Sequence, residues 1–87
     1  MKLFKKKENL KNTINEIETK LEAAKSNREI YLKSIQIETE DYIKRVSSGD
    51  NNLYYYTVSI VSLWNMVKRL SEQIEELEDI LTKLTRA

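Results

Sequence analysis

An apolar side chain recurs through the second half of the chain at spacings that alternate between three and four residues. The stripe passes without a break through Leu53, Tyr56, Ile60, Leu63, Val67, Leu70, Ile74, Leu77, Leu81 and Leu84. This is a heptad pattern with apolar a and d positions, sustained for more than four repeats. It predicts one long helix over residues 53–85 that packs this stripe against another helix.

The first half of the chain carries a rougher stripe of the same kind. Its members are Leu10, Ile14, Ile17, Leu21, Ala24, Arg28, Tyr31, Ile35, Glu38 and Tyr42. The pattern predicts a helix over residues 9–46. Arg28 and Glu38 are the charged members, and we expect them at the edge of the seam with their charged ends in water. A polar residue inside the seam would instead fix the register of the two helices at a cost in stability.

A single short turn joins the two stripes, because the chain has no proline and Gly49 is its only glycine. Gly49 can adopt the left-handed conformation that ends a helix. A turn over residues 47–52 then makes the helices antiparallel neighbours, and the second helix can be capped by Asp50, Asn51 or Asn52. We therefore predict a single all-α domain over residues 1–87, an antiparallel two-helix coiled-coil hairpin that pairs into a four-helix bundle.

A strand pair around the turn is the alternative fold. Tyr54, Tyr56, Val58 and Ile60 alternate along residue types that favour strands. On this interpretation, residues 34–61 include a β-hairpin and the chain is helix–β-hairpin–helix. The unbroken heptad pattern through the same residues favours the helix.

The fifteen residues from Leu53 to Val67 carry no charge, although a third of the chain is charged. On a helix, this stretch is apolar on its back as well as on its seam, and the first helix has isoleucines on its back near the turn. A helix that is apolar on two sides must be covered on two sides. The residues that we expect another chain to bury are Tyr54, Tyr55, Val58, Val61, Trp64, Ile30, Ile37 and Ile43.

These features indicate a non-enzymatic protein–protein interaction module: a small adaptor, inhibitor or assembly factor. The partner of the apolar residues is a second copy in a homodimer, another protein, or both. Histidine and cysteine are absent, so the usual zinc ligands and common nucleophile–base pairs are missing. We expect no catalytic, cofactor-binding or metal-binding residues, and we interpret the acidic residues 72–79 as a solvated helix face. The richness in Lys, Asn, Ile and Tyr indicates an AT-rich genome, such as that of a bacterium or phage, and the absence of cysteine is compatible with the cytoplasm.

A nucleic-acid-binding regulator is the alternative function. Lys5, Lys6, Lys7 and Lys11 form an N-terminal cluster that can contact phosphates. The competing interpretation is that this basic end pairs with the acidic end of the second helix, which would lie beside it in a hairpin.

A membrane-surface-associated helical protein is a third and less favoured interpretation. The uncharged stretch of fifteen residues is shorter than the roughly 20 residues that a membrane-spanning helix needs. The basic N-terminal segment and the aromatic stretch would also lie at opposite ends of the hairpin, so they cannot share one membrane face.

Overall fold

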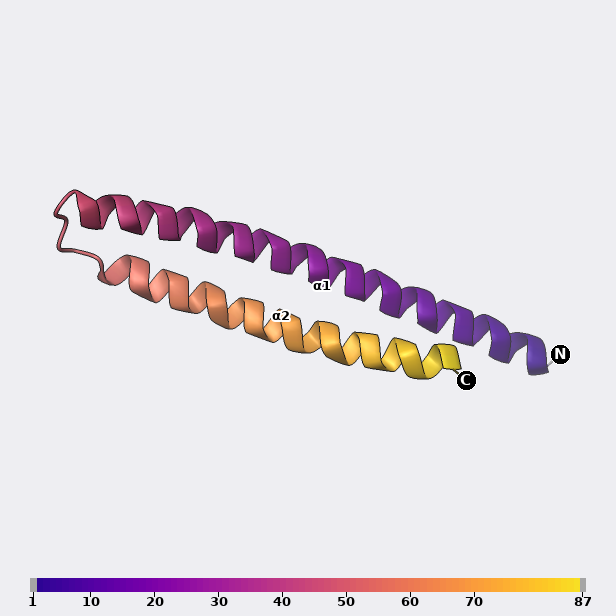
Figure 1. Ribbon diagram of the computed structural model, residues 1–87. Coiled ribbons are helices and arrows are strands. Elements are labelled where there is room, and N and C mark those ends of the chain that lie inside the picture. Colours follow the sequence, from indigo (N-terminus) through magenta and orange to yellow (C-terminus); the bar gives the residue numbers. More distant parts are fainter. Residues whose placement is uncertain (1, 87) are drawn as a thin grey trace.

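Two long helices lie side by side and antiparallel, joined by one short loop (Figure 1). The computed structural model describes the backbone of residues 2–86 and the side chains of residues 8–86. Helix α1 spans Lys2–Ser47 and helix α2 spans Tyr54–Arg86. The molecule is a rod of 72 × 16 × 14 Å. The prediction of an all-α antiparallel hairpin is confirmed. The β-hairpin alternative is wrong, because residues 34–47 and 54–61 are helical and no strand occurs within residues 2–86.

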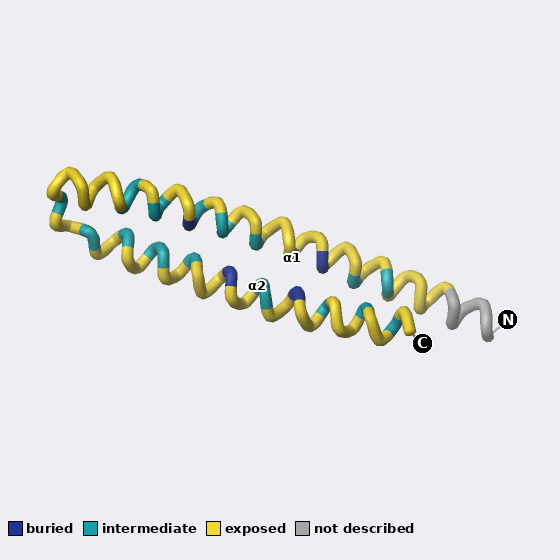
Figure 2. The backbone as a smooth tube through the Cα atoms, viewed as in Figure 1, coloured by how far each residue is buried: buried dark blue, intermediate teal, exposed yellow. Residues whose placement is uncertain are grey.

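The contact between the helices follows the two predicted stripes. Every stripe residue of α2 is buried or half-buried, and so is every stripe residue of α1 except Leu10, which is 37% exposed. The buried and half-buried positions lie along the facing sides of the two helices, and the outer sides are exposed (Figure 2). The seam is narrow, as expected for a pair of helices that shares only its a and d positions.

The core lies in the middle of the rod. Leu21, Ala24 and Ile74 form its buried cluster, with Leu70 and Leu77 among the side chains packed against it. Ala24 is only 3% exposed, although its small side chain makes it a weak member of the stripe. The small residue lets the large side chains of α2 fill the space between the helices, which is how close packing is reached in protein interiors.

The two charged stripe residues, Arg28 and Glu38, are both half-buried. One carboxylate oxygen of Glu38, Oε2, is buried and accepts no hydrogen bond from the protein. The prediction that Glu38 holds its charged end in water is therefore wrong for this oxygen. Glu38 lies within the seam, where an unpartnered polar atom lowers stability.

The turn ends α1 with a Schellman motif. The Asp50 N–H donates to the Arg45 carbonyl at 3.1 Å, and the Gly49 N–H donates to the Val46 carbonyl at 3.1 Å. Gly49 has a φ of +81°, the left-handed conformation that glycine adopts without strain. Asp50 then accepts the Asn52 N–H through Oδ1 at 3.0 Å. This Asx turn lies ahead of the first turn of α2, so Asp50 orders the loop rather than capping the helix.

Helix α1 is longer than its partner and continues past the C-terminal end of α2 (Figure 1). It begins at Lys2, ahead of the predicted start at residue 9, because lysine is a good helix former and no breaker precedes the stripe. Of the ion pairs between described side chains, one joins the helices, from Lys25 Nζ to Glu78 Oε1 at 3.9 Å. The acidic segment therefore lies beside the middle of α1. The prediction that it lies beside the basic N-terminus is wrong.

Candidate interaction surface

All eight residues that the sequence assigns to a partner are exposed in the hairpin. The values range from 47% for Val58 to 79% for Tyr54. They belong to a larger group of twelve exposed large hydrophobic side chains among the described residues, ten of which fall between residues 30 and 66. The exposed apolar surface is thus concentrated in the half of the rod next to the turn. The exceptions are Leu10 and Ile80, which stand singly in the other half.

The ion pair between the helices shows which helix positions share a side of the rod. Lys25 follows the seam residue Ala24 by one position, and Glu78 follows the seam residue Leu77 by one position. Both residues are therefore at heptad position e, and their contact places the e positions of α1 and α2 on the same side. Position b lies three or four residues from e, so it borders e on the helix surface. We call this side of the hairpin the b/e side.

The b/e side carries no charged residue throughout the turn-proximal half. Counting from the seam, its b and e positions are Leu32, Gln36, Thr39, Ile43 and Val46 on α1, and Tyr54, Thr57, Val61 and Trp64 on α2. We call these nine residues the charge-free face. Four of the predicted partner-binding residues belong to it. Val46 is 46% exposed but was not among the partner-binding residues predicted from the sequence. The first helix was expected to end at this residue, so its heptad position was not considered.

The opposite side, at positions c and g, holds three other predicted residues. Ile30, Ile37 and Tyr55 lie there, together with Met66. A hollow of about 190 Å³ on this side is lined by Asn27, Tyr31, Met66, Arg69 and Leu70. Charged residues are interspersed here, unlike on the charge-free face. The eighth residue, Val58, is at position f and points away from α1. The structure therefore divides seven of the eight predicted residues between two sides, leaves Val58 on the back of α2, and does not join the eight into one surface.

A polar cluster next to the turn lies on the c/g side. The Tyr56 hydroxyl donates to Asp41 Oδ2 at 2.6 Å, so this hydrogen bond links the two helices. The Arg45 guanidinium lies 5.3 Å from the centre of the Tyr56 ring and 3.7 Å from the Asp41 carboxylate. Tyr42 and Tyr55 contact the same ring edge-on, with centroids 6.4 and 5.6 Å away. The cluster fixes the register of the helices near the turn, where no residue of the seam is fully buried.

The pKa of Tyr56 is raised above the ordinary tyrosine value of about 10. The hydrogen bond to Asp41 is the largest cause, and desolvation of the hydroxyl is the second. Because the pKa is higher in the folded chain, this bond stabilises the hairpin fully below that ordinary value, and its contribution is lost as the pH rises through the folded-state pKa. We expect Tyr56→Phe to remove a midpoint above about 10 from the alkaline titration of tyrosine absorbance. Asp41→Asn should lower that midpoint. A midpoint in this range that survives Tyr56→Phe unchanged would contradict the assignment.

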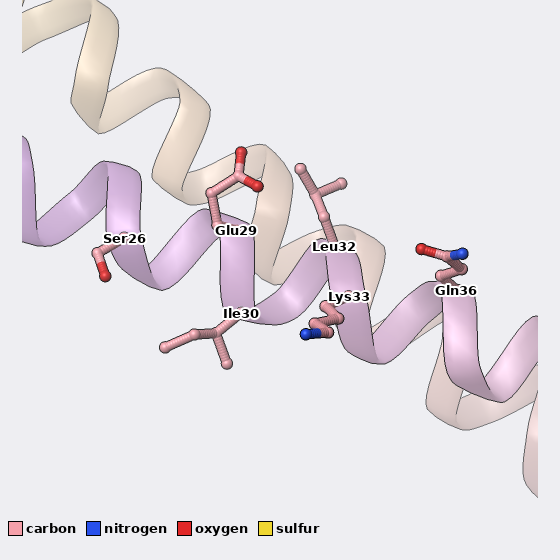
Figure 3. Close-up of a pocket in the computed structure, with 6 residues that line it drawn as sticks. All are labelled: Ser26, Glu29, Ile30, Leu32, Lys33 and Gln36. Atoms are coloured by element: carbon pink, nitrogen blue, oxygen red, sulfur yellow. The ribbon is translucent and has the colours of Figure 1, made fainter.

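A surface hollow of about 520 Å³ lies on the outside of α1 (Figure 3). All six residues that line it come from this one helix. Figure 3 shows Glu29, Leu32 and Gln36 projecting to one side of α1 and Ile30 projecting to the other. The view agrees with the division into two sides. Since no second element closes the hollow, it is an open helix surface and does not form a cleft for a small molecule.

Of the four lysines in the predicted phosphate-binding cluster, Lys11 is exposed on α1. The side chains of Lys5, Lys6 and Lys7 lie outside the described residues. Within the described part of the chain, no group of three or more acidic side chains is arranged to hold a metal ion. No helix in that part combines the length and apolar character needed to cross a bilayer.

Comparison with known proteins gives no relative for this chain. No protein-family model matches it, and no curated protein or solved structure is significantly similar to it.

Proposed function

We propose that this chain is a non-enzymatic protein–protein interaction module, an adaptor, inhibitor or assembly factor, that acts through the turn-proximal half of its hairpin. One observation carries the proposal. Ten exposed large hydrophobic side chains lie between residues 30 and 66, whereas the other half of the rod has only two among its described residues. Exposed apolar surface that is concentrated in one region is typical of a site that contacts another protein.

The energetics support this assignment. Val58, Val61 and Ile43 are each about half exposed, and fully burying a Val or Ile side chain is worth roughly 1.5–3 kcal/mol. Covering the exposed half of each therefore contributes about 1 kcal/mol. Trp64 and Tyr54 add aromatic area, and such residues dominate the binding energy of many protein interfaces. The exposed apolar residues of the turn-proximal half can thus contribute binding energy without any charged contact.

The test is the mass of the chain in solution, measured by light scattering over a range of concentrations at low salt and in 1 M NaCl. Where the chain associates with itself, its mass should exceed the 10.3 kDa of the monomer at both salt concentrations, because apolar burial is not screened by ions. Binding through the N-terminal lysines to a nucleic acid would instead weaken steeply with salt. An association that appears only at low salt would contradict the proposal, since charge would then drive it.

A further inference from the structure

We propose that the partner on the charge-free face is a second copy of this chain, with the two hairpins meeting b/e side to b/e side over their turn-proximal halves. This inference rests on the proposed function and names the partner that covers one of the two sides of the hairpin, the b/e side. The c/g side, with Ile37 and Met66, stays open in the pair. A dimer of this kind is a four-helix bundle over part of its length.

The absence of charge makes the face compatible with itself. In a twofold dimer the same patch is used by both copies, so any charge near the axis meets its own like charge. Like charges brought together across an interface are strongly unfavourable. The charge-free face avoids this throughout its nine residues. The c/g side does not, because Asp41 and Lys44 lie there among the apolar residues.

The surface area of the hairpin leaves room for a dimer. Its accessible surface is 7319 Å², whereas a compact monomer of 10.3 kDa has about 5,400 Å². The excess of about 1,900 Å² is more than twice the roughly 800 Å² that each partner buries in a standard interface. Pairing would therefore bring the exposed surface toward the value of an ordinary folded protein.

Helix α1 contributes five residues to the face and α2 contributes four, and most of the large residues lie at its two ends. Ile43, Val46 and Tyr54 lie next to the turn, and Leu32 and Trp64 lie at the far end. A twofold axis through the middle of the face would place the turn end of one copy against the far end of the other. Helix α2 of one copy would then lie against α2 of the other, with Tyr54 of each copy near Trp64 of its partner.

Charge in the other half of the rod favours this head-to-tail overlap over a pair with both turns at the same end. Outside the face, the b and e positions of residues 15–29 and 68–85 hold five carboxylates and two lysines: Glu18, Glu22, Glu29, Glu75 and Glu78, with Lys25 and Lys68. Turns at the same end would bring these two net negative surfaces together. In the head-to-tail overlap, the turn-distal halves point away from each other.

The test compares three exposed apolar residues, each replaced by aspartate, in the full chain. Val61→Asp changes the charge-free face, Ile37→Asp changes the c/g side of the same half, and Ile80→Asp changes the other half. The readouts are solution mass and helicity by circular dichroism. At a concentration where the wild type is dimeric, we expect Val61→Asp to give a monomer with its helicity retained, and the other two variants to remain dimers. If Val61→Asp loses helicity, Val61→Lys serves as the second variant.

The outcomes separate this inference from the proposed function. A monomeric wild type at every concentration, or a dimer lost with Ile37→Asp but kept with Val61→Asp, overturns the second copy on the charge-free face and leaves the interaction module standing. A dimer lost only with Ile80→Asp overturns the proposed function as well, because the turn-distal half would then be the contact.

Small-angle X-ray scattering tests the arrangement of the two copies. Two 72 Å rods that overlap over residues 32–46 should reach a maximum dimension of roughly 120 Å, at 1.5 Å per helical residue. A dimer no longer than one hairpin would overturn the head-to-tail arrangement.

Discussion

Ile74→Ala is expected to lower the free energy of unfolding by about 2–5 kcal/mol, the usual range when a large aliphatic side chain is removed from a core. Ile74 is 3% exposed and packs against Leu21 and Ala24 from the other helix. The loss combines the transfer free energy of the removed carbons with the cavity that they leave. It is large beside the 5–15 kcal/mol that stabilises a typical domain. Urea denaturation followed by helical circular dichroism measures it.

Ile80→Ala is the matched control for that experiment. Ile80 is in the same helix but is 44% exposed, so its truncation should change the free energy of unfolding by no more than about 0.5 kcal/mol. Both variants are compared with the wild type at one protein concentration, because association also contributes to apparent stability. Equal losses for the two variants would show that the seam seen here is not the core of the folded chain.

Glu38→Leu is expected to raise the free energy of unfolding by about 1–3 kcal/mol, the cost of leaving a buried polar group without a partner. Glu38 lies at a seam position, and its Oε2 is buried with no hydrogen bond. Leucine at the same position would fill the space without that cost. Glu22→Leu, at an exposed position of the same helix, is the control and should change little. A loss of stability in Glu38→Leu would mean that the carboxylate makes a favourable contact in solution.

The seam and the topology could be predicted from the sequence because both depend on spacing. The three–four alternation places its residues on one side of a helix whatever the rest of the chain does. Gly49 marked the turn, since only a glycine adopts its φ without strain. The strand propensity around Tyr54 did not prevail, because the same residues carry the heptad pattern and helix α2 buries part of it.

The burial of individual seam residues could not be predicted, because it depends on which residue of the partner helix faces each one. Ala24 reads as a weak stripe member, but it is among the most buried residues because Ile74 packs against it. Glu38 reads as a charge that reaches water, but one of its oxygens is enclosed. Leu10 was predicted as a seam residue, but it remains exposed, because the stripe of α2 has no member beyond Leu84 to cover it.

The exposed apolar residues could be predicted from the sequence, but their division between the sides of the hairpin could not. Sequence spacing identifies the back of one helix, and the sides of a hairpin require the relation between two helices. The Lys25–Glu78 contact supplies that relation. It separates Val61 and Trp64 from Ile37, a division that neither helix shows alone.

Tryptophan accessibility tests most directly whether another protein surface covers the turn-proximal half and leaves the turn-distal half exposed. Trp64 is the only tryptophan of the chain and lies on the charge-free face. A paired reporter carries Trp64→Phe with Ile80→Trp, which moves the probe to the other half. As the chain is concentrated into the range where it associates, acrylamide quenching of Trp64 should fall and quenching of the tryptophan at position 80 should stay constant. Two results would contradict this expectation. In one, acrylamide quenches Trp64 as strongly in the associated chain as in the dilute chain. In the other, association reduces the quenching of both probes equally.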